Sequence, residues 1–76
     1  EMGRLRIMNG KGDTAVTWEL DAEEAIKEAE RIFKEHRARG ASAFEIGSDK
    51  EATKVTEFNK NAEEIVIVPR VAGGMG

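Results

Sequence analysis

The chain opens with two short stretches in which polar and apolar residues alternate, which is the two-residue period of a half-buried β-strand. Residues 4–8 show this alternation, and residues 14–20 show it again, with Trp18 on the apolar side. Between them lies Asn9-Gly10-Lys11-Gly12-Asp13, and an Asn-Gly pair followed by a second glycine is typical of a tight hairpin turn. The pattern therefore predicts a two-stranded hairpin with Trp18 in the core.

After Leu20 the apolar residues recur at three-and-four spacing, which predicts an amphipathic helix. We expect Asp21 to cap its first turn and Glu24 to complete a capping box. Gly40 supplies the left-handed residue with which many helices end. The apolar stripe of this helix consists of Ala22, Ala25, Ile26, Ala29, Ile32, Phe33 and His36.

Further strands are predicted in the second half of the chain. Residues 42–46 form the first of them, with Phe44 and Ile46 expected to face inward. Residues 54–58 are more polar and predict a weaker strand near an edge of the sheet. Residues 65–68 are an unbroken run of β-branched side chains, which predicts a strand that is central or covered on both faces.

The resulting element order is β-β-α-β-β-β, and Pro69 ends the last strand because proline cannot donate to a sheet ladder. This order predicts an α+β fold, with one mixed sheet of about four to five strands and a helix packed across one face. We expect the last strand to run parallel to the first, in the middle of the sheet. A length of 76 residues allows one domain over 1–76, with a flexible C-terminal tail over 70–76.

The composition argues against several classes of function. Charged residues make up 36% of the chain and its net charge is −3, whereas nucleic-acid binding rests on a concentrated basic surface. No apolar stretch approaches the roughly 20 residues of a membrane-spanning helix, and no signal peptide is recognisable. We therefore expect a cytoplasmic protein that binds neither nucleic acid nor membrane.

No set of residues resembles a catalytic or metal centre. The chain has no cysteine and no tyrosine, and His36, its one histidine, falls on the apolar stripe of the helix, where its ring is expected to pack. Adjacent carboxylates such as Glu23 and Glu24 do not face each other on a helix. The sequence therefore predicts no catalytic residue, no metal and no bound cofactor, in a protein that is not itself an enzyme.

The outward side of the first predicted strand carries a different kind of candidate site. Arg4, Arg6 and Met8 alternate with the inward residues, so they are expected to share one face of the sheet. An exposed methionine beside basic side chains predicts a surface for a protein partner.

The end of the sequence is its most distinctive part. The last apolar strand and Pro69 lead into Arg70-Val71-Ala72-Gly73-Gly74, and Met75-Gly76 follow. Fully extended, residues 70–74 reach about 16 Å. Because glycine has no Cβ, such a tail can pass through a narrow channel and deliver a carboxylate into the site of another protein.

The segment from Glu64 to Gly74 combines an acidic residue, an apolar strand, a proline and Val-Ala-Gly-Gly. In this it is similar to the C-terminus of small β-grasp sulfur carriers, namely the small subunit of molybdopterin synthase and the thiamin sulfur carrier. The element order also resembles the ubiquitin-like β-grasp fold, which prokaryotic ubiquitin-like modifiers share. The close match covers about a dozen residues. In these families an E1-like enzyme uses ATP to adenylate the terminal glycine carboxylate.

The resemblance implies a role for each residue of the tail. Gly74 would carry the reacting carboxylate, with Gly73 beside it in the threaded end. The stretch in contact with the activating enzyme would consist of Pro69, Arg70, Val71 and Ala72.

The sequence also departs from the sulfur carriers. Arg70 stands where they usually have a second proline, and Met75-Gly76 follow the glycine pair, so a processing protease would have to remove two residues before Gly74 has a free carboxylate. The activated product would pass sulfur to an acceptor as a thiocarboxylate or acylate lysines of target proteins. The alternative is a β-grasp binding or assembly module that is never conjugated and docks a partner through its sheet face.

Overall fold

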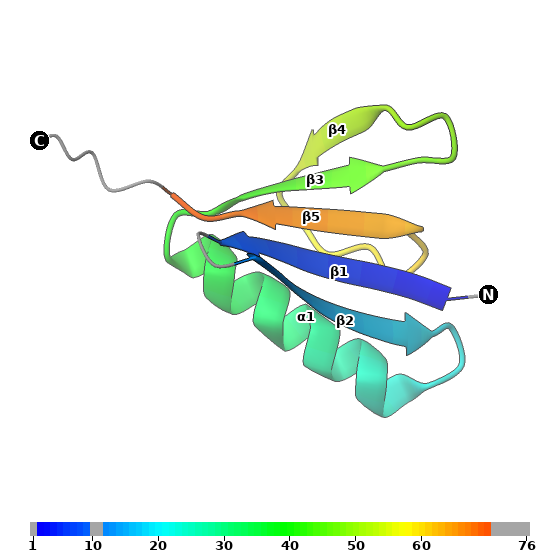
Figure 1. Ribbon diagram of the computed structural model, residues 1–76. Coiled ribbons are helices and arrows are strands. Elements are labelled where there is room, and N and C mark those ends of the chain that lie inside the picture. The colour runs from blue at the N-terminus through cyan, green and yellow to red at the C-terminus, as the bar shows by residue number, and fades with distance from the viewer. Residues whose placement is uncertain (1, 10–11, 71–76) are drawn as a thin grey trace, which may run out of the picture.

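A computed structural model describes residues 2–9 and 12–70 and shows one mixed sheet with a helix beside it (Figure 1). Its elements are β1 (Met2–Asn9), β2 (Gly12–Glu19), α1 (Glu23–Ala38), β3 (Ser42–Ile46), β4 (Ala52–Val55) and β5 (Glu64–Val68). Within the described part of the chain the sheet has five strands, in the order β2-β1-β5-β3-β4. The predicted α+β class and element order are confirmed, and the arrangement is compatible with a β-grasp fold. The turn residues Gly10 and Lys11 lie outside the described residues.

The central strand of the sheet is β5. It pairs in parallel with β1, where Leu5 lies opposite Ile65 and Ile7 lies opposite Ile67, and it pairs antiparallel with β3 on its other side. The prediction that the last strand runs parallel to the first in the middle of the sheet is therefore confirmed. This position fixes the direction in which the chain leaves the sheet after β5.

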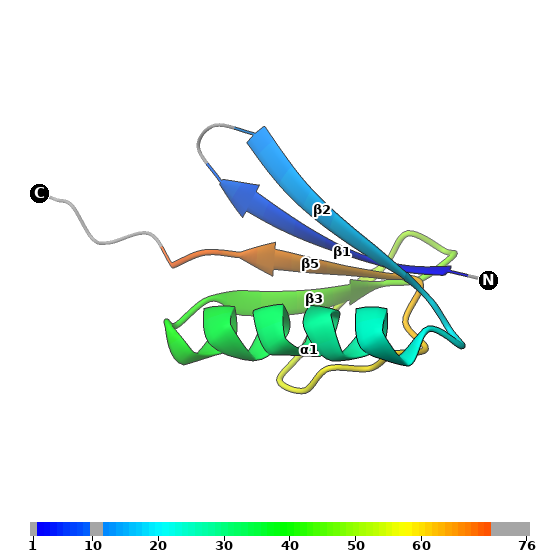
Figure 2. The ribbon, with the colours of Figure 1, turned by 90° about the horizontal axis from the view of Figure 1, so that it is seen from below.

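The hydrophobic core lies between the sheet and α1, which covers one face of the sheet (Figure 2). Leu5, Ile65 and Ile67 of the inner strands are fully buried, and Phe33 joins them from α1 with 1% of its surface exposed. Ala29, one turn before Phe33, is also fully buried. The predicted apolar stripe of the helix is thus the face that meets the sheet.

Trp18 is buried in this core, as the alternation along β2 predicts, with 1% of its surface exposed. Its ring lies against the backbone of Gly3, where a Cβ would overlap the indole. Its Nε1 donates a hydrogen bond to the carbonyl oxygen of Lys60 at 3.0 Å, so the buried polar atom has a partner. The ring of Phe58 lies 5.3 Å from it between centroids. Trp18 therefore joins the first hairpin to the segment that precedes β5.

The start of α1 differs from the prediction, and its end agrees with it. The N-cap residue is Ala22 and makes no side-chain cap bond, so the expected capping box of Asp21 and Glu24 is wrong. The reason is that the Ala22 N–H donates to the Glu19 carbonyl at 2.9 Å, which places Asp21 in the turn leaving β2. At the other end Gly40 has φ +94°, the left-handed geometry that the sequence predicts.

The predicted facing of β3 is wrong. Ala43 is fully buried, whereas Phe44 and Ile46 are only partly buried and do not belong to the core. The pairing with β5 sets this orientation, because Ala43 lies opposite the buried Ile67 and Phe44 lies opposite Val66. In a strand, a shift of one residue moves every side chain to the other face.

The expectations for β4 and for the far side of β5 are met only in part. β4 is an edge strand, as predicted, but it covers residues 52–55 instead of 54–58. Residues 56–58 leave the sheet, and the Phe58 ring meets Phe33 of α1 at 5.8 Å between centroids. Of the two alternatives predicted for residues 65–68, the structure bears out the central place and not cover on both faces, since Val68 is 38% exposed and Val66 is partly exposed.

Candidate functional site: the base of the tail and the open sheet face

The base of the C-terminal tail is held where β5 meets the end of α1. Pro69 is half-buried and Arg70 is exposed. The Arg70 side chain crosses Gly40, and a Cβ built on Gly40 would lie 3.2 Å from Arg70 Cδ. A cation at this point also faces the negative end of the helix dipole. Arg70, predicted to contact an activating enzyme, thus rests on its own helix terminus.

The remaining residues predicted for the reactive tail lie outside the described residues. They are Val71, Ala72, Gly73 and Gly74, followed by Met75 and Gly76. The structure brings together the two described members of that set, Pro69 and Arg70, at the point where the chain leaves the central strand.

The predicted partner residues on β1 do share the face of the sheet opposite α1. Arg4 and Met8 are exposed, Met8 to 43%, and Arg6 is partly buried between them. Arg6 Nη1 lies 2.9 Å from Glu64 Oε2 of the neighbouring β5, with side-chain exposures of 33% and 24%. This partly screened ion pair joins the side chains of the neighbouring strands β1 and β5.

Sequence reasoning missed most of the apolar part of this face. Across the strands, Arg6 lies opposite Val66, Val66 opposite Phe44, and Phe44 opposite Lys54, so these side chains form one row. Val68 of the same strand as Val66 is also exposed. The sequence held no signal for it, because the unbroken β-branched run of residues 65–68 has no alternation of polar and apolar residues.

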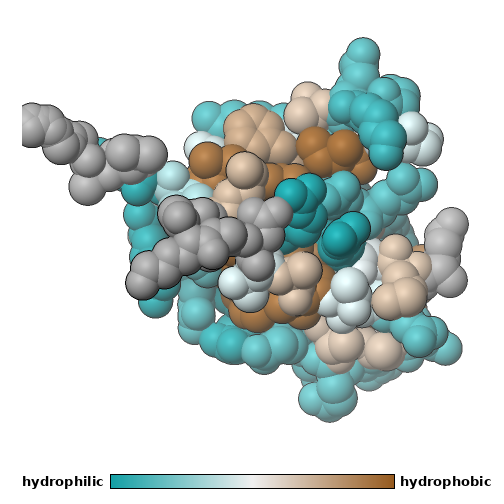
Figure 3. Space-filling model, viewed as in Figure 1, coloured by the Kyte–Doolittle hydropathy of each residue, from teal (hydrophilic) through white to brown (hydrophobic). Residues whose placement is uncertain are grey.

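Together these residues make a surface that we call the open face, composed of Arg4, Arg6, Met8, Phe44, Ile46, Lys54, Glu64, Val66 and Val68. Figure 3 views this side of the molecule and shows apolar surface beside strongly hydrophilic groups. Three of its charges are basic, and its acidic residue Glu64 is paired with Arg6. The open face can therefore dock an apolar partner surface with acidic groups at its rim.

The described residues offer little else for chemistry. No three His, Cys, Asp or Glu side chains among them gather into a group that could hold a metal ion. His36 is partly buried on α1, as its place on the apolar stripe predicts. Over residues 2–9 and 12–70, no helix has the length and apolar character to cross a membrane.

Comparisons of the chain with protein-family models, with curated proteins and with solved structures found no match.

Proposed function

We propose that this chain is a ubiquitin-like modifier or sulfur-carrier protein whose Gly74 carboxylate is adenylated by an E1-like enzyme. The observation that carries the proposal is the position of β5. A central strand, bonded on both edges, leads directly into Pro69, Arg70 and the diglycine segment. Because this strand is hydrogen-bonded on both edges, the tail starts from a fixed position in the fold. A partner that binds the folded body can therefore position Gly74.

The proposed chemistry belongs to the partner enzyme. The Gly74 carboxylate oxygen attacks the α-phosphorus of ATP, and pyrophosphate leaves as the acyl adenylate forms. A sulfur nucleophile then attacks the acyl carbon and expels AMP, which gives a thiocarboxylate for sulfur transfer or a thioester that acylates a target lysine. Because residues 70–74 extend over about 16 Å, the reacting carbon can enter a deep site while the folded body stays outside.

Gly74 can react only after the Gly74–Met75 peptide bond is hydrolysed. A processing protease would add water across that bond, release Met75-Gly76 and leave the carboxylate on Gly74. In the sequence, residues 73, 74 and 76 around this bond are glycines, and Met75 carries the side chain that the protease would have to accept.

The experiment combines each of three chains with an E1-like adenylating enzyme from the same organism, ATP and a thiol probe. The chain ending at Gly74 is expected to form an adenylate and then a thioester, detected by pyrophosphate release and by mass. The 1–76 chain without protease and a chain ending at Gly73 are expected to form neither. Equal activity of all three chains, or no product from the chain ending at Gly74, contradicts the proposal.

A second candidate function is favoured by the open face. In this case the protein is a non-conjugated β-grasp binding module, and the partly exposed Phe44 and Val66 and the exposed Val68, beside Arg4 and Arg6, dock a protein partner. Replacing Phe44 with serine is then expected to weaken partner binding at least tenfold, because large apolar anchors dominate such interfaces. Deleting residues 71–76 is expected to leave binding unchanged, whereas loss of function on that deletion favours the tail.

A further inference from the structure

Three arginines lie around the point where the chain leaves β5. Arg37 is in the last turn of α1, Arg39 is its C-cap residue, and the Arg70 side chain lies against Gly40, the residue that follows. The two ribbon views agree in placing the end of α1 beside the exit of the chain from β5 (Figure 1, Figure 2). We call these three residues the arginine cluster. Neither the reaction at Gly74 nor docking on the open face uses the two arginines of the helix end.

The charge of the arginine cluster is not neutralised within the described part of the chain. Over residues 2–9 and 12–70, none of its three members forms an ion pair, whereas Arg6, Arg31 and Lys34 each form one. Glu35 stands four residues before Arg39, at the usual spacing of a helical ion pair, but its carboxylate lies 2.6 Å from Arg31. The cluster therefore keeps its positive charge available to a partner that binds beside the tail.

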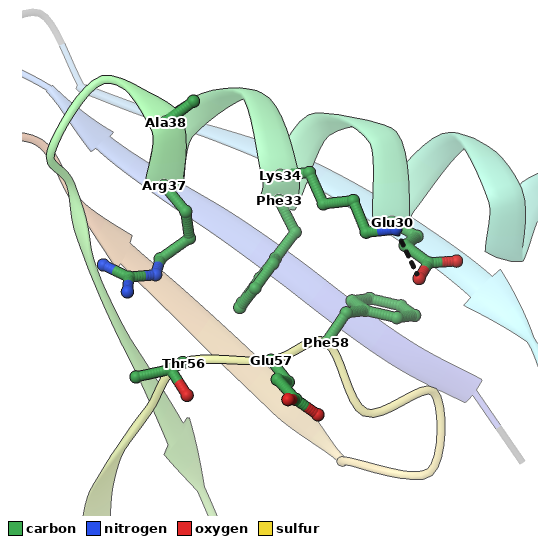
Figure 4. Close-up of a pocket in the computed structure, with 8 residues that line it drawn as sticks. All are labelled: Glu30, Phe33, Lys34, Arg37, Ala38, Thr56, Glu57 and Phe58. Carbon is green, nitrogen blue, oxygen red and sulfur yellow. Dashed lines mark ion pairs between the residues drawn. The ribbon is translucent and has the colours of Figure 1, made fainter.

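The end of α1 needs one of these side chains, and the other two remain uncommitted. Backbone groups already serve the last turn, since the Gly40 N–H donates to the Arg37 carbonyl at 2.9 Å. Arg37 Nη1 donates to the Ala41 carbonyl at 2.8 Å, which fixes its guanidinium beside the chain that continues into β3 (Figure 4). Arg39 and Arg70 are exposed and make no side-chain hydrogen bond among the described residues. Their guanidinium groups can therefore pair with carboxylates of another protein.

The rest of the molecule carries the opposite charge. The chain has a net charge of −3, and α1 begins with Glu23 and Glu24 at the end away from the tail (Figure 1). In the field of a negatively charged partner, a protein with a positive end and a negative body turns its positive end toward that partner. A basic partner surface would attract the body instead and turn the tail away. The charge distribution therefore favours an acidic partner surface at the tail end.

Two apolar side chains adjoin the same exit from the other face of the sheet. Ile7 lies opposite Ile67 in the parallel pairing, so Met8 and Val68 follow on neighbouring strands. Their surfaces are 43% and 38% exposed, and we call them the apolar pair. Apolar side chains, methionine among them, and arginine are enriched in protein interfaces, where polar groups form the rim. A partner that contacts both the apolar pair and the arginine cluster encloses the base of the tail.

We propose that the E1-like enzyme docks on the arginine cluster through carboxylates at the entrance of its channel, while an adjoining apolar surface covers the apolar pair. This inference rests on the proposed function and names the surface by which the partner recognises the folded body. Arg39 and Arg70 pair with the carboxylates, and the fixed guanidinium of Arg37 adds to the positive potential. The tail then begins at the entrance of the channel.

The test measures pyrophosphate release by the E1-like enzyme as the concentration of the chain ending at Gly74 is varied. Arg39→Glu is expected to raise KM about fivefold or more and to leave kcat within about twofold, because it weakens docking and not the chemical step. Arg39→Lys keeps the charge and is expected to raise KM less than Arg39→Glu. Raising the salt concentration from about 0.05 M to about 0.5 M is expected to raise the wild-type KM and to narrow its difference from Arg39→Glu.

A charge reversal at the other end of the same helix supplies the matched control. Lys27→Glu makes an equal charge change at an exposed position of α1 and is expected to leave KM within about twofold of wild type. Urea denaturation checks that Arg39→Glu is folded, and Arg70→Gln, which lies outside the helix, is a second variant expected to raise KM.

The outcomes separate this inference from the proposed function. If the wild-type chain is adenylated but Arg39→Glu and Arg70→Gln leave KM unchanged, the docking proposal fails and the proposed function stands. An equal rise of KM in Lys27→Glu and Arg39→Glu would show an effect of net charge alone, which also overturns the docking proposal. If the wild-type chain forms no adenylate, the proposed function fails and this inference fails with it.

Discussion

At the scale of single residues, Gly3 lies directly against the indole of Trp18, so a methyl group there has no room. We predict that Gly3→Ala lowers the free energy of unfolding by about 1–3 kcal/mol, the usual cost of overpacking a core. Urea denaturation of the wild type and the variant measures this difference in the free energy of unfolding. Arg4→Ala, one position along and on the open face, is the control and should stay within about 0.5 kcal/mol of wild type. An unchanged Gly3→Ala midpoint would mean that Trp18 does not occupy this position.

Gly40 is constrained twice, by its backbone and by Arg70. Its φ of +94° disfavours any side chain, at a cost of about 1–2 kcal/mol, and the 3.2 Å approach of Arg70 Cδ adds a steric term. We predict that Gly40→Ala destabilises the fold by more than that backbone cost. In the Arg70→Ala background the loss should be smaller, which a double-mutant cycle measures as a non-zero coupling. A coupling of zero would contradict the contact between Arg70 and Gly40.

At the scale of secondary-structure elements, alternation and periodicity predicted which elements form, but pairing decided their orientation. β1, β2 and the stripe of α1 followed their patterns because their branched and aromatic apolar residues, such as Leu5, Trp18 and Phe33, lie on the buried face. In β3 the large residue Phe44 points away from the core and Ala43 points into it, since β5 imposes the register. Because pairing decides the orientation, the sequence pattern alone also did not predict the apolar part of the open face. No local signal distinguishes Ala43 from Phe44 until the partner strand is known.

This orientation of β3 can be tested by volume. Ala43→Leu should destabilise the protein by about 1–3 kcal/mol because the core has no space for the added carbons. Phe44→Leu, the adjacent change on the open face, should cost much less. Chemical denaturation measures the free energy of unfolding of both variants. A larger loss for Phe44→Leu than for Ala43→Leu would show that Phe44 faces the core.

The outer surface of α1 carries an ion-pair cluster with a predictable pH response. Arg31 lies 2.6 Å from both Glu28 and Glu35, and its hydrogen bond holds the pKa of Glu28 below the ordinary value. Because the folded-state pKa is lowered, the pair stabilises the helix above the unfolded-state pKa, and this effect is lost as the pH falls through the folded-state value. Arg31→Gln should raise the Glu28 pKa in an NMR titration, and high salt should reduce the difference. An unchanged pKa would contradict the contact.

At the scale of the whole molecule, the base of the tail at Pro69 and Arg70 follows the same central strand that contributes Val66 and Val68 to the open face. Among residues 2–9 and 12–70, the buried core runs from Leu5 to Ile67. We therefore predict that a chain ending at Arg70 has the same free energy of unfolding as the full chain, within about 0.5 kcal/mol, when both are measured by urea denaturation. The shortened chain is expected to lose adenylation completely. Phe44→Ser should show the complementary result, in which partner binding is weaker and adenylation of Gly74 is unchanged. A destabilisation of more than about 1 kcal/mol in the shortened chain would show that the tail packs on the folded body. The proposal that the body is equally stable without its reactive tail would then fail.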